Sequence, residues 1–206
     1  MDKVGTNAIP TLLWMLRQTD SPFKRKVTEL VRKQHFIRIH SIPAEEINHA
    51  GYLAFRELGA RAEAAVPGLI ALLNDKNPDV RYTAVFALRS LGQVAGDALP
   101  SLIKCLKDPE FTVQSDAILG LGEIHQEPER VIPILVELLD KPQNPQHSVI
   151  LRANAIWALV QFGAQAKPAV PVLRRFLNDG QEGIRWDLTN ALKAIDPEAA
   201  AKAGVR

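Results

Sequence analysis

Apolar and polar residues alternate in blocks along residues 66–92, and the blocks predict two helices. The first apolar block, residues 69–73, follows Pro67, a residue tolerated in a first helical turn because no intrahelical hydrogen bond is lost there. A polar segment, residues 74–79, has the composition of a helix end followed by a helix start. The second block keeps its apolar residues on one helix face: Val80, Ala84, Ala87, Leu88 and Leu91. The pattern predicts a hairpin of helix A and helix B, which needs neighbours to bury its apolar face.

The same hairpin pattern recurs along the chain, mostly at a fixed interval. Pro100 and Pro133 follow Pro67 at steps of 33 residues, and Pro171 begins the last copy after an insertion of five residues within Lys141–His147. We expect each copy to begin near its proline. A fixed period of this length is the sequence signature of a stacked-repeat protein. The predicted repeats cover residues 4–34, 35–58, 59–92, 93–125, 126–163 and 164–206, and the second has a reduced helix A.

Two repeats are predicted ahead of the Pro67 copy. Pro10 and the aliphatic residues after it match helix A at a shift of 57 residues, and Ser21-Pro22 is typical of the start of a helix B. Residues from about Ala44 to Leu58 match the helix B of a second repeat. The helix A of that repeat is missing or reduced to residues 35–43.

The order of residues within each copy resembles the HEAT repeat. A copy begins with proline and two or three aliphatic residues, continues with aspartate and a short loop, and ends with an aliphatic residue and arginine, alanine, Ala-Leu and glycine. The resemblance covers nearly the whole chain. It implies an all-α fold of the HEAT/armadillo-like superfamily, a right-handed α-solenoid of about five to six helical hairpins that forms one domain over residues 1–206. It also implies a non-enzymatic scaffold that binds other proteins.

Several recurrent residues are expected to support the stack. The arginines are Arg81, Arg152 and Arg185 at the start of helix B, and the aspartates are Asp75, Asp108 and Asp179 at the end of helix A. Arginine and aspartate in these places can form a ladder of hydrogen bonds between adjacent turns. Cys105, the only cysteine, occupies a core position of helix A, which predicts a buried structural thiol and excludes an internal disulfide. Gly120 takes the position of Ala87, which favours close helix packing.

Aromatic and basic residues on helix B predict where a partner binds. Successive residues of a helix are rotated by about 100° around its axis. Positions 82, 86 and 89 therefore lie on the side of helix B that faces away from the core. The partner-binding candidates at these and equivalent positions are Tyr82, Phe86, Arg89, Leu119, Trp157, Val160, Trp186, Asn190 and Lys193. In HEAT-like stacks the B helices line the concave side, so the resemblance implies that these residues line a groove. Packing of Phe86 and Trp157 against the adjoining repeat is an equal alternative, whereas Tyr82 and Trp186 favour the groove.

A basic segment near the N-terminus predicts a second kind of site. Six cations and Glu29 give residues 21–42 a charge of +5, so the rest of the chain, which is +2 overall, sums to −3. The anion-binding candidates are Lys24, Arg25, Lys26, Arg32 and Lys33. They favour nucleic acid, phosphate or acidic lipid as a ligand, and the alternative, which we prefer, is the solvated face of an amphipathic helix.

Motifs of catalysis are absent from the sequence, and no cofactor or metal site is predicted. The chain has no Gly-x-Ser-x-Gly, no Cys-x-x-Cys and no phosphate-binding loop, and the paired His-Glu motifs of HEAT-like hydroxylases are missing. Glu45 and Glu46 precede His49 at helical spacing, but a carboxylate at a helix start explains them better than half of a metal site. A bilin lyase of HEAT-like architecture stays open as the enzymatic alternative.

The composition and the N-terminal residues indicate where in the cell the protein is located. No run of 18 apolar residues is available to span a bilayer, and the first ten residues contain no apolar segment of a secretory signal. We expect a cytoplasmic protein by default, or an extracytoplasmic one if an N-terminal segment has been removed. Val4-Gly5 resembles the end of a helix B, which indicates that a longer native protein has been trimmed.

Overall fold

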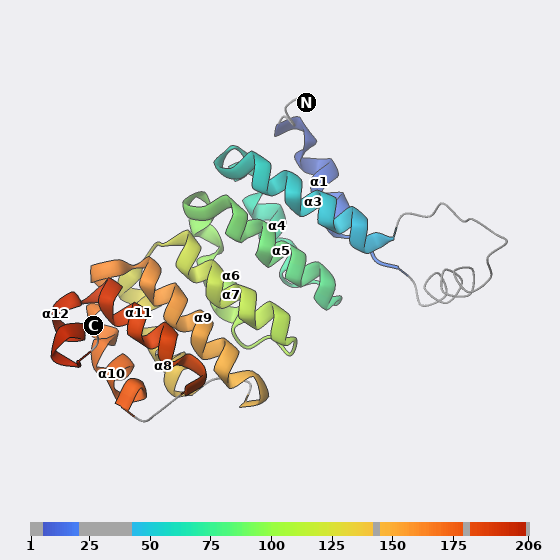
Figure 1. Cartoon of the computed structure of the whole chain (residues 1–206). Coiled ribbons are helices and arrows are strands. Elements are labelled where there is room, and N and C mark those ends of the chain that lie inside the picture. Colours follow the sequence, from blue (N-terminus) through green and yellow to red (C-terminus); the bar gives the residue numbers. More distant parts are fainter. Residues whose placement is uncertain (1–5, 21–42, 142–144, 179–181, 205–206) are drawn as a thin grey trace.

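The computed structural model describes residues 6–20, 43–141, 145–178 and 182–204, and these residues form helices with no strand. The B helices of the sequence pattern lie side by side in chain order (Figure 1). The B helices are α3 (Ala44–Leu58), α5 (Pro78–Leu91), α7 (Phe111–Ile124), α9 (Ser148–Gln161) and α11 (Arg185–Ile195). The A helices are α1 (Ile9–Leu16), α4 (Val66–Leu72), α6 (Leu99–Cys105), α8 (Pro128–Asp140) and α10 (Val170–Asn178), and α12 (Pro197–Lys202) follows the last hairpin.

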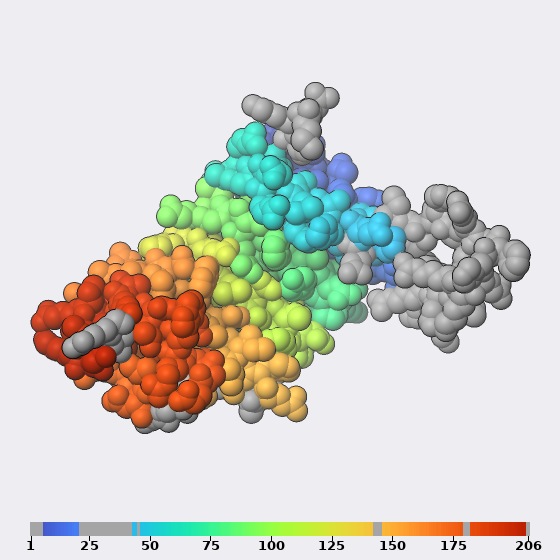
Figure 2. Space-filling model, viewed as in Figure 1, coloured from blue at the N-terminus to red at the C-terminus, as the bar shows by residue number. Residues whose placement is uncertain are grey.

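Each A helix packs against a B helix, and each B helix packs against the next B helix along the chain. The space-filling view shows the consequence as bands of colour in sequence order, each adjoining its neighbours (Figure 2). This is the all-α solenoid that the sequence predicts, in which stability is a sum of contacts between neighbouring repeats. No helix in the described ranges is long and apolar enough to cross a bilayer.

Glycine ends three of the B helices and turns the chain into the next A helix. Gly59, Gly92 and Gly163 have φ angles of 51°, 61° and 52°, a conformation that costs a residue with a side chain more than it costs glycine. A seven-residue stretch of 3₁₀ turns begins at each glycine, and η2 and η3 are kinked within it: η2 (Gly59–Ala65), η3 (Gly92–Ala98) and η5 (Gly163–Ala169). Each segment has two alanines, three residues apart, that pack into the core. All six are fully buried: Ala62, Ala65, Ala95, Ala98, Ala166 and Ala169.

The junction between α7 and α8 is built differently, and it corrects one expectation. His125 ends α7 in the left-handed conformation, Glu127 adopts it as well, and α8 begins at Pro128 without a preceding 3₁₀ helix. Pro133, which was expected to begin this copy, therefore lies inside the helix. Pro10, Pro67 and Pro100 do stand in the first turns of their helices. The difference arises because no glycine follows Ile124, so a second proline starts the helix five residues earlier.

At the N-terminal end of the described structure, α1 packs against α3. The Asn48 Nδ2 atom donates to the Gln18 carbonyl oxygen at 3.0 Å, and the Ala44 backbone N–H donates to Asp20 Oδ2 at 3.1 Å. α1 thus packs on α3 as each later helix A packs on its own helix B. Residues 21–42, where the sequence predicts another helix B, the reduced helix A and the basic cluster, lie outside the described residues. The division of residues 4–58 into two repeats therefore stays a prediction.

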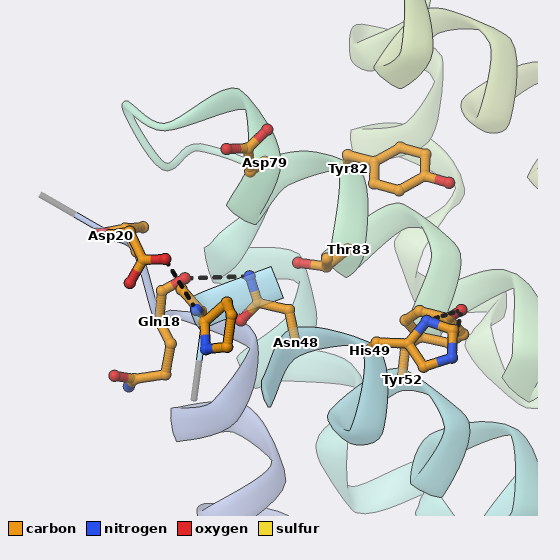
Figure 3. A pocket seen from close by; sticks show the side chains of 11 residues that line it. Gln18, Asp20, Asn48, His49, Tyr52, Asp79, Tyr82 and Thr83 are labelled. Carbon is orange, nitrogen blue, oxygen red and sulfur yellow. Dashed lines mark hydrogen bonds between the residues drawn. The ribbon is translucent and has the colours of Figure 1, made fainter. Parts of the chain in front are cut away.

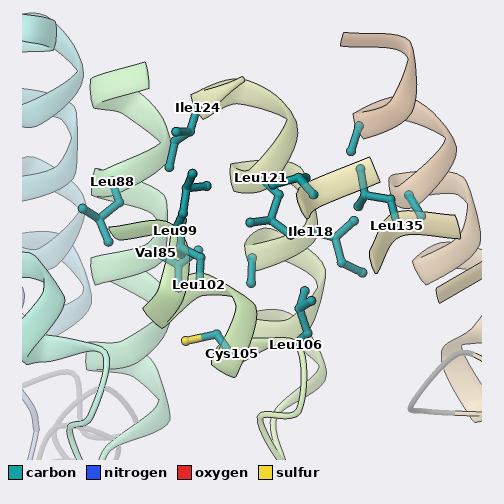
Figure 4. Packing of buried hydrophobic residues seen from close by; sticks show 14 of the residues in the cluster. Val85, Leu88, Leu99, Leu102, Cys105, Leu106, Ile118, Leu121, Ile124 and Leu135 are labelled. Carbon is teal, nitrogen blue, oxygen red and sulfur yellow. The ribbon is translucent and has the colours of Figure 1, made fainter. Parts of the chain in front are cut away.

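Leucine, isoleucine and alanine side chains form one continuous core that runs through all the described repeats. Figure 4 shows its middle section, which includes Leu88 of α5, Leu99 of α6 and Leu121 of α7. Cys105 lies in this core and is 6% exposed, as expected for a structural thiol. Burial raises the pKa of the Cys105 thiol to about 11, and the nearby Asp108 carboxylate adds to this rise. The thiol is therefore poorly suited to act as a nucleophile at neutral pH.

Arg81 forms the predicted rung between two repeats. Its Nε and Nη2 atoms donate to the two Asp108 carboxylate oxygens at 2.7 Å each, and its Nη1 atom donates to the Asp75 carbonyl at 2.9 Å. A guanidinium held by a bidentate carboxylate fixes both distance and orientation. In the next repeat Gln114 replaces arginine and donates to the Asp108 carbonyl at 2.6 Å. These contacts set the position of α5 and α7 relative to their loops.

Candidate functional site

The nine predicted partner-binding residues belong to four consecutive B helices and none of them is fully buried; we call the surface that they form the B face. It comprises Tyr82, Phe86 and Arg89 of α5, Leu119 of α7, Trp157 and Val160 of α9, and Trp186, Asn190 and Lys193 of α11. Because α5, α7, α9 and α11 pack side by side, the B face is continuous from one repeat to the next. Its residues nevertheless differ in how much of each side chain is accessible.

The C-terminal half of the B face carries the most exposed aromatic residues. Trp186 is 76% exposed in the first turn of α11, and Trp157 is 39% exposed on the neighbouring α9. Val149 and Ile150, in the first turn of α9, are 51% and 47% exposed. Lys193 is exposed, and Val160 and Asn190 are half-buried. Large apolar side chains left open on adjacent helices mark a surface that can bind another protein.

At its N-terminal end the B face continues onto α3 through an aromatic cluster of Tyr52, Tyr82 and Phe86. The Tyr52 ring of α3 lies 4.6 Å from the Phe86 ring of α5 between centroids, and the Tyr82 ring lies 6.4 Å from Phe86. The Tyr52 hydroxyl forms a hydrogen bond of 2.5 Å with His49 Nδ1. Phe86 therefore packs against the preceding repeat and is half-buried, and its role in binding a partner stays a prediction. Burial raises the pKa of the Tyr82 phenol, and the Asp116 carboxylate adds to the rise.

Arg89 joins α5 to α7 through two carboxylates. Its Nη1 atom donates to Asp116, its Nη2 atom donates to Glu123 Oε1 at 2.7 Å, and its guanidinium lies 5.4 Å from the Phe86 ring centroid. The side chains of Arg89 and Asp116 are 16% and 13% exposed. Burial raises the pKa of the Asp116 carboxyl, and Arg89 opposes this rise without cancelling it. The structure thus places Arg89 in an internal ion-pair cluster, so its cation is not presented freely to a partner.

The middle of the B face is formed by a close approach of two helices. Gly122 of α7 occupies the position that Arg89 has in α5, and a Cβ atom added there would lie 2.8 Å from the Ala158 Cα atom of α9. Gly120 lies under the Arg89 side chain, whose Cγ atom would be 3.1 Å from an added Cβ. Leu119 is half-buried beside them. The two glycines therefore bring α5, α7 and α9 together, which supports the expectation of close packing at Gly120.

A polar pocket adjoins the aromatic cluster at the first turns of α3 and α5 (Figure 3). Its volume is about 600 Å³, within the range of about 300–1,000 Å³ that is typical of ligand pockets. Asp20 and Asp79 contribute carboxylates, and Tyr52 and Tyr82 contribute rings that are shared with the B face. Asn48, which is 6% exposed, also lines the pocket, and its Oδ1 atom has no hydrogen-bond partner among the described residues.

The sequence did not reveal Tyr52, Asp116 or this pocket as parts of the site. Tyr52 stands one period before Val85, at a position that is buried and aliphatic in α5, α7 and α9. A ring with a hydroxyl group at this position was the available signal. Asp116 stands one period after Thr83, and the equivalent residue of α9, Asn154, donates its Nδ2–H to Ser115 Oγ of α7 at 2.7 Å. The pocket could not be found because it depends on how α1 packs against α3 and α5.

The sequence also raised an anion-binding site and a metal site. All five anion-binding candidates, from Lys24 to Lys33, lie outside the described residues. In the described part of the chain, no group of three or more His, Cys, Asp and Glu side chains is arranged to hold a metal ion.

Two family models match the sequence, namely HEAT repeats at residues 66–150 and the PBS lyase HEAT-like repeat at residues 151–179. A comparison with curated proteins found no match.

Solved structures share the fold at low sequence identity. An engineered protein from the Northeast Structural Genomics Consortium superposes with a TM-score of 0.51 at 18% identity, over 96% of this chain and 98% of the other. A second engineered protein from the same consortium has a TM-score of 0.49 at 17% identity, over 98% of this chain and 65% of the other. The two repeat families cover adjoining parts of the chain, and the first engineered protein shares its helical architecture along nearly the whole length. The chain is a HEAT-repeat protein.

Proposed function

We propose that this protein is a non-enzymatic scaffold that binds a segment of another protein along the B face. HEAT repeats form helical scaffolds that commonly mediate protein interactions, and the PBS lyase HEAT-like match identifies a type of repeat and no catalytic group. The observation that carries the proposal is the exposure of Trp157 and Trp186 on adjacent helices. Tryptophan and tyrosine are enriched among the energetic hot spots of protein interfaces.

The geometry of the B face indicates a long, narrow ligand. Four helices that pack about 8–10 Å apart extend over about 30 Å from α5 to α11, a length that suits an extended peptide or a helix. The two ends of the surface carry the aromatic residues, with Tyr52, Tyr82 and Phe86 at one end and Trp157 and Trp186 at the other. A partner segment would therefore place one bulky side chain at each end.

The proposal is tested by selecting peptides from a random phage-displayed library on the immobilised protein and measuring their affinity by calorimetry. Replacing Tyr82, Trp157 and Trp186 together by alanine should weaken binding by at least about 100-fold, because removing one hot-spot residue costs about 2 kcal/mol or more. Far-ultraviolet circular dichroism checks that the variant keeps its helices. Unchanged peptide affinity in this variant would contradict the proposal.

Trp14 provides a matched control for the tryptophan substitutions. It is 57% exposed, but it lies on α1, a helix A, away from the B face. Replacing Trp14 by alanine should leave peptide affinity within about twofold of the unaltered protein, since surface changes away from an interface have small effects. If the Trp14→Ala variant lost as much peptide affinity as the B-face variant, peptide binding would depend on exposed tryptophan in general.

A further inference from the structure

We infer that the partner segment bound on the B face is a proline-rich peptide in the polyproline II conformation, with an apolar residue at every third position. This inference rests on the proposed function and specifies the conformation and the chemistry of the partner. It follows from the spacing of apolar side chains across the B helices, the area of the exposed aromatic surface, and the charges and hydrogen-bonding groups of the face.

One apolar side chain stands at the equivalent position of four consecutive B helices, and we call these residues the apolar row. They are Leu53 of α3, Phe86 of α5, Leu119 of α7 and Trp157 of α9, each one repeat after the last. The first three are half-buried, and Trp157 is 39% exposed. Because these four helices pack side by side (Figure 1), a segment that crosses them meets one member of the apolar row at each helix.

The distance between neighbouring B helices selects the conformation of the ligand. Packed helices lie about 8–10 Å apart. Gly122 keeps α7 and α9 at the short end of this range, because an added Cβ atom would lie 2.8 Å from the Ala158 Cα atom. Every third residue of a polyproline II helix recurs after about 9.3 Å. Residues on one face of a β-strand recur after about 6.7 Å, and those seven apart in an α-helix after about 10.5 Å. The repeat of polyproline II therefore matches the helix spacing best.

The exposed aromatic surface is small, which favours a single peptide strand over a second folded copy of the chain. A buried aromatic side chain covers about 150–250 Å², so the exposed parts of Trp157 and Trp186 amount to about 170–290 Å². Val149 and Ile150, which have smaller side chains, add less than this. A stable protein interface takes about 800 Å² from each partner. A narrow segment that contacts side chains in a line requires less.

The polar groups of the B face suit an uncharged ligand that accepts hydrogen bonds. Two carboxylates of α7 bind the Arg89 guanidinium, so this central cation is already paired. Tyr82 contributes a hydroxyl, and Trp157 and Trp186 contribute indole N–H groups, which can only donate. Proline has no N–H, and the carbonyl oxygens of polyproline II have no internal partner. Rings with donor groups are the surfaces on which other domains bind proline-rich segments.

The test compares two uncharged peptides of the same composition on the full chain by calorimetry. In acetyl-(Pro-Pro-Leu)₄-amide, leucine recurs at every third position, and in the control peptide the four leucines recur at every second position. Both peptides favour polyproline II because of their proline content. The period-three peptide should bind at least about tenfold more tightly, since only its leucines keep pace with the apolar row. Equal affinities, or no binding of the period-three peptide, would overturn the inference.

Leu119 and Ile103 give a matched pair of substitutions. Both are half-buried aliphatic residues, but Leu119 lies in the middle of the apolar row and Ile103 lies on α6, an A helix. Leu119→Ala should weaken binding of the period-three peptide by about fivefold, and Ile103→Ala should leave it within about twofold. Far-ultraviolet circular dichroism checks that both variants keep their helices. Equal effects of the two substitutions on affinity would also overturn the inference.

The peptides selected from the random library separate this inference from the proposed function. The inference expects them to be rich in proline, with an apolar residue at every third position. Selected peptides that need Trp157 and Trp186 yet lack this pattern would overturn the inference and leave the proposed function standing. Selected peptides whose affinity survives replacement of Tyr82, Trp157 and Trp186 by alanine would instead overturn the proposed function.

Discussion

Arg89 is held by two carboxylates of the next helix, and this pairing decides what its side chain can do. The sequence places Arg89 on the outer side of helix B, and the structure agrees with that position. Asp116 and Glu123, however, engage the guanidinium from α7. A helical wheel treats one helix at a time, so it predicts the direction of a side chain but not the residues that meet it from the neighbouring helix.

Replacing Arg89 by methionine should destabilise the protein in a pH-dependent way. The change leaves the buried Asp116 carboxylate without its main cation, and we expect the free energy of unfolding to fall by about 1–3 kcal/mol at neutral pH. Burial raises the pKa of Asp116, so its ionised form opposes folding, and the loss should shrink as acidification protonates it. Urea unfolding at about pH 7 and about pH 5 measures both effects.

Arg185 is the control for this substitution. It is exposed and pairs with the exposed Glu182, so Arg185→Met should change stability by less than about 0.5 kcal/mol. A loss in the Arg89→Met variant that is the same at both pH values would contradict the role given to Asp116.

Cys105 should make stability depend on pH under alkaline conditions. Its pKa is raised from 9.0 to about 11 in the folded protein, so the unfolded chain releases the thiol proton first as pH rises. The stability that the buried thiol contributes is complete below pH 9.0 and is lost progressively toward about pH 11. The difference in unfolding free energy between the unaltered protein and a Cys105→Ala variant should therefore narrow over this range. A constant difference would contradict burial of the thiol.

At the scale of single elements, the positions of helices follow from apolar spacing and turn residues. The periodic blocks predict α5 and α7 as B helices, and the expected bounds of α3, about Ala44 to Leu58, are those of the structure. The start of α8 was missed because proline at position 133 satisfies the same pattern whether it opens a helix or lies within one. Which of the two occurs depends on the residues before it, where His125 replaces the usual glycine.

Gly122 and Gly120 should respond differently to alanine. At Gly122 the added Cβ meets the Ala158 backbone at 2.8 Å, so α7 and α9 must move apart, and the cost of overpacking, about 1–3 kcal/mol, should exceed the gain in helix propensity of about 1 kcal/mol. At Gly120 the nearest atom belongs to the flexible Arg89 side chain, so the two effects should nearly cancel. Thermal unfolding of the two variants measures the difference. A Gly122→Ala variant as stable as Gly120→Ala would contradict the close approach of α7 and α9.

At the scale of the whole molecule, the repeats make one elongated body with a continuous B face. The architecture was predictable because a hairpin that recurs with one period can bury its apolar side only against its own copies. The B face was predictable as a direction, and Trp157 and Trp186 are exposed there. The polar pocket was not predictable, because it forms where α1 and α3 pair across a long separation in sequence.

The three tryptophans allow the central claim, binding of a partner segment on the B face, to be measured directly. In a Trp14→Phe variant the remaining tryptophans are Trp157 and Trp186, both on the B face. Titration with a selected peptide should shift their fluorescence emission to shorter wavelength and saturate at the affinity found by calorimetry. A variant that keeps only Trp14 should bind more weakly and show no spectral shift. A shift of Trp14 emission, with Trp157 and Trp186 unchanged on binding, would contradict the account.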